Sequence, residues 1–311
     1  MKTMRARTLM AHGLLLAVVL VWGATFSLVK AALTATTPLL FNLLRMTLAF
    51  AVLAAVSGPS LRGMTRTDLK LGAMAGLFLG LGYQLQTSGL KFTTAPKAAF
   101  ITGLVVVIVP LLSAVPGVAL PGSLKPTFDT YAGAGLAFAG LVLLTTPPGA
   151  GMALFSGIGL GEWLCLGCAV AFAAHLLMLA RAAPRVSARR LGTLQIGFAA
   201  VVLLVTLPLG GRPYFHGTVM VWVALGVTAV LATAAAFTIQ SWAQQHLPAS
   251  HTALIFTLEP VFAWLTSLLF FGEELGRRAM LGAGLILAGI LLAKLRPTSR
   301  GRSQLLPIAG A

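Results

Sequence analysis

Residues 133–140 read GAGLAFAG and residues 282–289 read GAGLILAG, so one apolar octapeptide recurs almost unchanged after 149 residues. An offset of 150 residues joins further matches: Pro110 with Pro260, Thr102 with Thr252, and LLRMTLAFAVL around Arg45 with TLQIGFAAVVL around Gln195. Low-complexity apolar sequence can align with itself by chance. A near-constant offset over most of the chain instead favours an internal repeat of two halves.

Composition indicates that both halves lie in a membrane. The 311 residues are 58% hydrophobic and 9% charged, and their mean hydropathy is +0.95. A soluble domain of this length and composition would aggregate, so the chain is predicted to be an integral membrane protein. Cys165 and Cys168 lie inside an apolar run and offer no disulfide framework. The basic, apolar N-terminus resembles a signal peptide, but its apolar run continues to Lys30, which favours a first spanning helix.

A bilayer core needs roughly 20 apolar residues per helix. Breaks at glycine, proline and charge clusters then predict ten spans, near 12–33, 38–57, 70–89, 97–119, 130–146, 161–181, 191–209, 219–243, 249–271 and 278–295. Five helices per repeat place the two halves in opposite orientations. The expected fold is thus all-α, with about ten transmembrane helices arranged as an inverted five-plus-five repeat. Its parts are a first repeat over 1–150, a second over 151–296 and a tail over 297–311.

Charge predicts the orientation of this bundle. If both termini are cytoplasmic, fifteen of the 22 Lys and Arg residues fall on the cytoplasmic side and six on the other, with Arg45 inside a helix. This follows the positive-inside rule and predicts a multi-pass protein of the cell membrane. The formal charge of +16 would suggest nucleic acid in a soluble chain, but here it is read as topology signal and anionic-lipid contact. No nucleic-acid partner is expected.

Several segments together resemble the EamA-type branch of the drug/metabolite transporter superfamily. They are VWGATFSLVK, LLRMTLAF, KFTTAPKAAFITGLVVVIVPLLSAV, LPASHTALIFTLEPVFAWLTSLLFFGEEL and GAGLILAGILL, in this order over about residues 12 to 295. The resemblance implies a ten-helix exporter or exchanger with a central cavity lined by both halves. Carried over by position, the family's motifs fall on Trp22-Gly23, Arg45, Pro110, Glu259-Pro260 and Gly272-Glu273. The first half has PGVALPGSLKP where many members repeat a Gly-Glu, which argues against a symmetric role for Glu273.

Glu259 is the ionisable residue that most needs an explanation. A charged side chain in the middle of a membrane helix costs about 2.5 to 3.5 kcal/mol even on insertion scales. Pro260 interrupts the helix next to it and frees a backbone carbonyl, which is tolerated where the chain faces protein or a cavity. Two interpretations stay open: Glu259 is a proton acceptor that couples proton movement to transport, or it caps polar neighbours such as Gln240 or Arg45.

Polar and aromatic residues on the predicted spans are the candidate site. Thr252, Phe256 and Glu259 share one helical face. Glutamines often only bridge helices, a lone histidine often bonds a neighbour, and Arg45 can attract a carboxylate, pair with an acid or anchor its helix. The predicted substrate-binding residues are Trp22, Tyr83, Gln86, Thr102, His175, Gln240, Thr252 and Glu259.

These features favour a secondary transporter of small metabolites, amino-acid-like or drug-like, that works as an exporter. A membrane-embedded enzyme is the alternative, but it would need a second acid, a zinc set or a nucleophile with a base. His246 and His251 lack the HExxH spacing, and Cys165 and Cys168 lack the strand pattern of a redox pair. Neither a cofactor nor a metal ion is expected. The sequence leaves the substrate, the coupling ion and the oligomeric state open.

Overall fold

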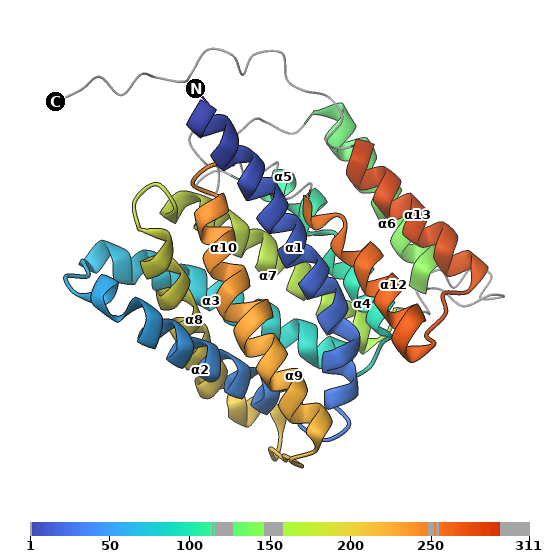
Figure 1. Cartoon of the computed structure of the whole chain (residues 1–311). Helices are drawn as coiled ribbons and strands as arrows, with labels where there is room; N and C mark the ends of the chain where they lie inside the picture. The colour runs from blue at the N-terminus through green and yellow to red at the C-terminus, as the bar shows by residue number, and fades with distance from the viewer. Residues whose placement is uncertain are drawn as a thin grey trace.

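The computed structural model describes residues 2–113, 115, 127–145, 158–247, 252 and 255–292, and the regular structure in these ranges is helical (Figure 1). The first half contains α1 (Lys2–Ala32), α2 (Pro38–Ser57), η1 (Gly58–Leu61), α3 (Arg66–Leu90), α4 (Ala95–Thr102), α5 (Val105–Ser113) and α6 (Phe128–Thr145). The second contains α7 (Leu160–Ala182), α8 (Ala188–Thr206), η2 (Leu207–Gly210), α9 (Val219–Ala229), η3 (Val230–Ala235), α10 (Ala236–Ala243), α12 (Glu259–Phe271) and α13 (Arg277–Leu292). The predicted all-α class is confirmed for these residues.

Membrane-spanning capacity is clear for part of the bundle. Within the described residues, six helical stretches are long and apolar enough to cross a bilayer: Ala6–Ala32, Pro38–Leu61, Ala95–Ser113, Leu160–Ala182, Ala188–Gly210 and Val219–Ala243. Two further apolar helices, Tyr131–Leu144 and Glu259–Phe271, are shorter. Each of the ten predicted spans overlaps at least one helix. The multi-pass membrane character is therefore confirmed, whereas the count of ten spans stays a prediction.

Helix packing follows a pattern that relates the two halves. Helix α1 packs on α12 and on the segment α9–η3–α10, while α7 packs on α4, α5 and α3. Helix α2 packs on α8, and α6 packs along α13 at one edge of the bundle (Figure 1). Exchanging the halves turns the contacts of α1 into those of α7 and leaves the pairs α2–α8 and α6–α13 unchanged.

Helices α3 and α8 approach closely because glycines line their interface. A Cβ atom built on Gly76 would lie 2.5 Å from Phe198 Cβ, and one built on Gly72 would lie 2.6 Å from Leu194 Cβ. Such small-residue seams let membrane helices pack backbone to backbone. The glycines of α3 thus bring the two halves into close contact.

Loops at each end of the bundle are tied to one another across the halves. At one end, Tyr214 O accepts a hydrogen bond from Thr37 N at 3.2 Å, and Ala35 O accepts one from His216 N at 2.8 Å. At the opposite end, Arg190 Nη1 forms an ion pair with Asp68 Oδ2 at 3.2 Å. Asp68 also closes the capping box with which α3 begins. Both ends of the bundle are held together in this conformation.

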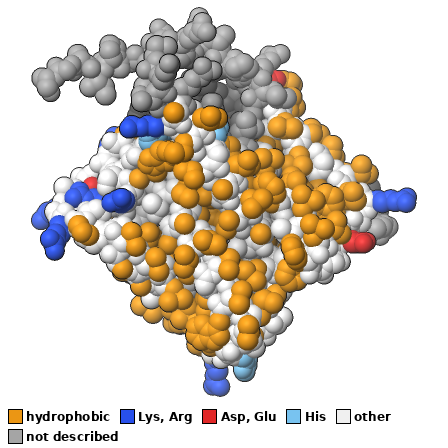
Figure 2. Space-filling model, viewed as in Figure 1, with side chains coloured by type: hydrophobic (Ala, Val, Ile, Leu, Met, Phe, Trp, Pro, Cys, Tyr) orange, Lys and Arg blue, Asp and Glu red, His pale blue; other side chains and the backbone are white. Residues whose placement is uncertain are grey.

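The surface of the bundle is suited to lipid. Figure 2 shows hydrophobic side chains across the visible face, with Lys and Arg side chains gathered toward its edges. Phe270 is 77% exposed and Trp222 57% exposed. Exposed apolar area on this scale marks a membrane-facing surface.

Candidate functional site

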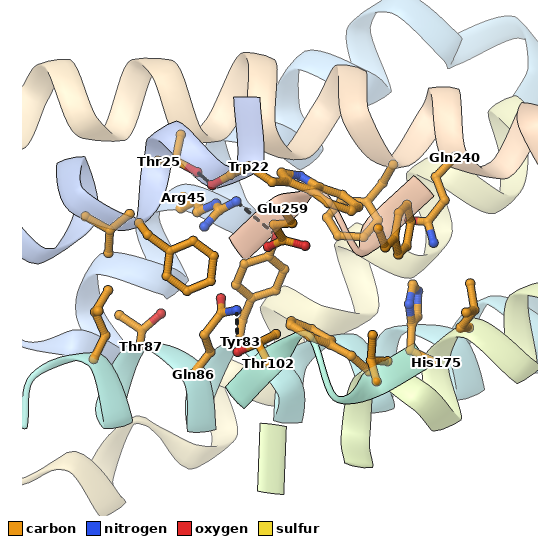
Figure 3. Close-up of a pocket in the computed structure, with 18 residues that line it drawn as sticks. Trp22, Thr25, Arg45, Tyr83, Gln86, Thr87, Thr102, His175, Gln240 and Glu259 are labelled. Atoms are coloured by element: carbon orange, nitrogen blue, oxygen red, sulfur yellow. Dashed lines mark hydrogen bonds between the residues drawn. The ribbon is translucent and has the colours of Figure 1, made fainter. Parts of the chain in front are cut away.

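A cavity lies inside the bundle between helices of both halves (Figure 3). Its volume is about 70 Å³, which holds only a few water molecules. Its lining comes from α1, α2, α3, α4, α5, α7, α10, α12 and the turn before α12: Trp22, Thr25, Phe26, Val29, Arg45, Tyr83, Gln86, Thr87, Leu90, Thr102, Val105, Phe172, His175, Leu176, Phe237, Gln240, Phe256 and Glu259.

Seven of the eight predicted site residues line this one cavity. They come from six helices, and the first and last of them are more than 200 residues apart in sequence: Trp22, Tyr83, Gln86, Thr102, His175, Gln240 and Glu259. The eighth, Thr252, is fully buried, is not among the lining residues, and finds no hydrogen-bond partner for its hydroxyl group within the described part of the chain. Their assignment to substrate stays a prediction, but their convergence makes this cavity the candidate site.

Two interrupted helices meet beside the cavity. The first-half helix breaks at Gly103 and Leu104, between α4 and α5, and the second-half helix breaks at Thr257 and Leu258, just before α12. A Cβ atom on Gly103 would lie 3.0 Å from Pro260 Cγ, so the two breaks pack against each other. Discontinuous helices in corresponding positions of two repeats are typical of transporter binding sites. Within the predicted span 249–271, the interruption expected at Pro260 falls at Thr257 and Leu258, and α12 begins at Glu259.

Glu259 stands in the first turn of α12 with its carboxyl group in the cavity (Figure 3). Among the described residues, none donates a hydrogen bond to this carboxyl group or forms an ion pair with it. The suggested capping contacts are thus not formed among the described residues, and Arg45 bonds other groups. The amino-terminal end of a helix favours a negative charge at this position.

Arg45 is buried to 3% exposure, and its side chain turns into the bundle instead of extending to the membrane surface. Its Nε donates to Thr233 Oγ1 at 2.7 Å, and its Nη2 donates to the Tyr83 hydroxyl oxygen at 3.0 Å and to Ala232 O at 3.4 Å. The guanidinium group also lies 4.3 Å from the centroid of the Tyr83 ring. These contacts fix a cation in the wall of the cavity.

A π-helical segment, η3, supplies the acceptors that hold this wall. Ala232 O accepts from Trp22 Nε1 at 2.8 Å as well as from Arg45. A π-helical turn shifts the backbone register and is frequent at functional sites. The sequence VLATAA contains neither glycine nor proline, so no break residue marks this segment.

Aromatic rings form the apolar part of the lining. Phe237 lies centrally, with its ring centroid 5.3 Å from that of Trp22, 6.0 Å from that of Tyr83 and 5.8 Å from that of His175. Phe172 packs on Tyr83 at 5.3 Å, nearly perpendicular to it. Sequence reasoning missed Phe172 and Phe237, because phenylalanine in an apolar span carries no signal that separates cavity lining from core.

Some polar side chains that line the cavity have hydrogen-bond partners and others do not. His175 Nε2 lies 2.8 Å from Gln195 Oε1, and Gln86 Nε2 donates to Thr102 Oγ1 over 3.5 Å. Gln240 is 2% exposed, and its Oε1 has no hydrogen-bond partner among the described residues. A buried amide oxygen without a partner costs about 1 to 3 kcal/mol unless something else binds it. The described residues thus leave this acceptor of Gln240 unused.

Comparisons with known proteins agree with this architecture. A model of the EamA-like transporter family matches the chain twice, over residues 9–146 and 159–295. A protein of Archaeoglobus fulgidus described as an uncharacterized transporter is 34% identical over 281 residues, which cover 90% of this chain and 84% of that protein. A crystal structure with 21% sequence identity aligns with a TM-score of 0.64 over 92% of this chain and 97% of the solved chain, which shows a common fold. The chain belongs to the EamA-like transporter family.

Proposed function

We propose that this membrane transporter is a secondary carrier that exports small metabolites, amino-acid-like or drug-like, across the cytoplasmic membrane. One observation carries the proposal: a cavity inside the bundle gathers aromatic rings, an unsatisfied amide, a fixed cation and a carboxyl group from both halves. Concave sites of mostly apolar lining with a few convergent polar groups are typical of small organic ligands. Family membership indicates a transporter rather than an enzyme.

The architecture we propose is ten spans in two inverted repeats, residues 1–150 and 151–296, followed by a cytoplasmic tail over 297–311. The exchange symmetry of the helix contacts supports it, as do the paired helix breaks at Gly103 and Thr257. Alternating access then needs one half to rock against the other around the central cavity. We further propose that Glu259 exchanges a proton during this cycle.

Survival of a sensitive host tests export. Cells that overproduce the protein are expected to tolerate toxic amino acid analogues or dyes better than cells with the empty vector, because a carrier lowers the internal concentration. The Gln240→Ala variant, produced at the same level, should give less protection. Higher sensitivity of the overproducing cells would mean uptake and would contradict the proposed direction.

Gln240→Ala is expected to reduce transport at least severalfold while the amount of folded protein in the membrane stays unchanged. The physical reason is that the amide oxygen of Gln240 has no described partner to lose, so its removal affects a bound molecule more than the fold. Gln84→Ala is the matched control, because Gln84 Oε1 accepts from Thr206 at 2.9 Å outside the cavity. Transport per folded molecule separates the two roles, and equal losses in both variants would contradict the assignment of Gln240.

The proposed orientation predicts which loop cysteines are labelled from outside. Pro213→Cys, in the exposed loop after η2, should react with an impermeant thiol reagent in intact cells, whereas Ser187→Cys, in the exposed loop before α8, should react only after lysis. The native Cys165 and Cys168 are fully buried, so the unmodified protein is the unlabelled control. Labelling of position 187 in intact cells would reverse the topology.

A further inference from the structure

We propose that Arg45 binds the carboxylate of the transported molecule, so that this cavity selects small carboxylates, amino-acid-like zwitterions among them. The proposal rests on the proposed function, since it takes the central cavity as the transport site. It deepens that function by naming the substrate class and the group that recognises it.

The charge of Arg45 is buried and has no acidic partner among the described residues. Arg45 lies inside a membrane-spanning helix at 3% exposure, and no acid among the described residues lies within ion-pair distance of it. Burying an uncompensated cation costs several kcal/mol, and native proteins almost always pair such a group. An anion that enters the cavity would supply the missing partner.

The hydrogen bonds of Arg45 do not require a charged side chain. The acceptors of Arg45 are a hydroxyl group of Thr233, the hydroxyl group of Tyr83 and one backbone carbonyl. These are neutral acceptors, and a neutral donor could satisfy them without the cost of burying charge. Trp22 Nε1 does so for the same carbonyl oxygen, Ala232 O, at 2.8 Å. Holding the π-helical segment therefore does not account for a guanidinium group.

The guanidinium group of Arg45 is only partly used by its hydrogen bonds. The three hydrogen bonds use Nε and Nη2, and the described residues give Nη1 no hydrogen bond. Figure 3 shows Arg45 and Tyr83 among the residues that line the cavity. A guanidinium group that is held through some of its N–H groups while others stay free is preorganised to bind a carboxylate. Little side-chain entropy then remains to be lost on binding.

The rest of the cavity complements an amino acid. Glu259 presents a carboxyl group of opposite sign to Arg45 in the same cavity without forming an ion pair with it. Gln240 Oε1 is a further acceptor without a partner. The rings of Trp22 and Phe256, 5.2 Å apart between centroids, add apolar surface. An amino acid with an apolar side chain would match the Arg45 cation, the polar acceptors and this surface.

Thermal stabilisation of the purified full-length protein tests the proposal with defined probes: leucine, phenylalanine, leucinamide and phenylalaninamide. Each acid differs from its amide at the carboxyl group alone. A ligand that binds the folded state raises the melting temperature, so midpoints across a concentration series report affinity. The wild type should bind the acids at least tenfold more tightly than the amides, as expected for charged hydrogen bonds. Equal shifts for acid and amide, or no shift with either acid, overturn the proposal.

Variants of the arginine site separate recognition from folding. Arg45→Lys keeps the charge but loses the fork, and should weaken the acids about tenfold or more while the amides change less than about twofold. Tyr83→Phe removes the hydroxyl group that holds Nη2, keeps the ring, and should weaken the acids severalfold in the same selective way. Equal weakening of acid and amide in both variants would mean that Arg45 only supports the fold, and would overturn the assignment.

Exchange measurements keep this proposal distinct from the proposed function. Both proposals are tested in vesicles that hold the purified protein. Leucinamide or a cationic dye could be exchanged equally fast by wild type and Arg45→Lys while leucine is not exchanged. That result would support a carrier but would reject selection of carboxylates. Saturable leucine exchange that falls at least tenfold in Arg45→Lys supports the proposal. A lack of exchange for every probe would reject the proposed function itself.

Discussion

Replacing Glu259 with glutamine is expected to leave substrate exchange intact and to abolish its acceleration by a pH gradient. Glutamine keeps the size of the side chain and mimics the protonated carboxyl group, so the cavity can still close over substrate. The charged form of Glu259 is costly in a closed, dry cavity and is stabilised when water reaches it. Its protonation therefore depends on whether the cavity is open to one side of the membrane. Transport into vesicles with and without an imposed pH gradient measures the effect.

Two further variants sharpen this test. Glu274→Gln makes the same chemical change at an exposed loop position and should behave as wild type. The other titratable side chains that line the cavity are Arg45, Tyr83 and His175, of which only the imidazole normally titrates near neutral pH. His175→Asn is therefore measured in parallel. If the Glu259→Gln protein still accumulates substrate with unchanged pH dependence, while His175→Asn loses it, the proton site is the histidine.

Gly23→Ala is expected to reduce the yield and thermal stability of the folded protein strongly. A Cβ atom at position 23 would lie 2.6 Å from Phe262 Cβ, 2.8 Å from Ala263 N and 2.8 Å from Glu259 O. Two of these are backbone atoms, which no side-chain rotation can move aside. Helix α12 would have to shift away from α1, and overpacking of this kind typically costs about 1 to 3 kcal/mol. The thermal midpoint of purified protein checks the loss.

Gly13→Ala on the same helix is the matched control. A Cβ atom at Gly13 would meet nothing within 4 Å, and alanine has the higher helix propensity. The two variants therefore carry the same change on α1 with opposite expected effects. Equal stability of both would show that α1 and α12 do not pack as closely as described, and would remove the basis for the position of Glu259.

The repeat visible in the sequence predicted much of the fold, because both halves keep one spacing of apolar runs. Pro260 pointed to an interrupted helix beside Glu259, and the structure places that interruption at Thr257 and Leu258. The break at Gly103 and Leu104 was not predicted, because the matching Pro110 lies further along the chain, inside α5. Gly103 packs against Pro260, and no local sequence pattern shows such a contact.

The site was predictable where a residue type is costly in a membrane. Glu259, Gln240 and His175 stood out because polar groups in lipid need a reason, and all three line the cavity. The environment of Arg45 could not be predicted, because its partner Thr233 lies 188 residues away in sequence. Thr233 also lies on a π-helical segment that contains no glycine or proline to indicate it. Phe237 was missed for a different reason: its ring is like those of many core residues.

Counterflow in vesicles that hold the purified protein is the most direct measurement for a secondary carrier with a central binding cavity. Vesicles are loaded with unlabelled leucine, and labelled leucine is added outside at a low concentration. The wild type should accumulate label transiently and saturably without any energy source, and Gln240→Ala should do so at least severalfold more slowly, whereas Gln84→Ala should match the wild type. Chemical conversion of leucine without exchange, or exchange that is unaffected by both Gln240→Ala and Arg45→Lys, would contradict a carrier that works through this cavity.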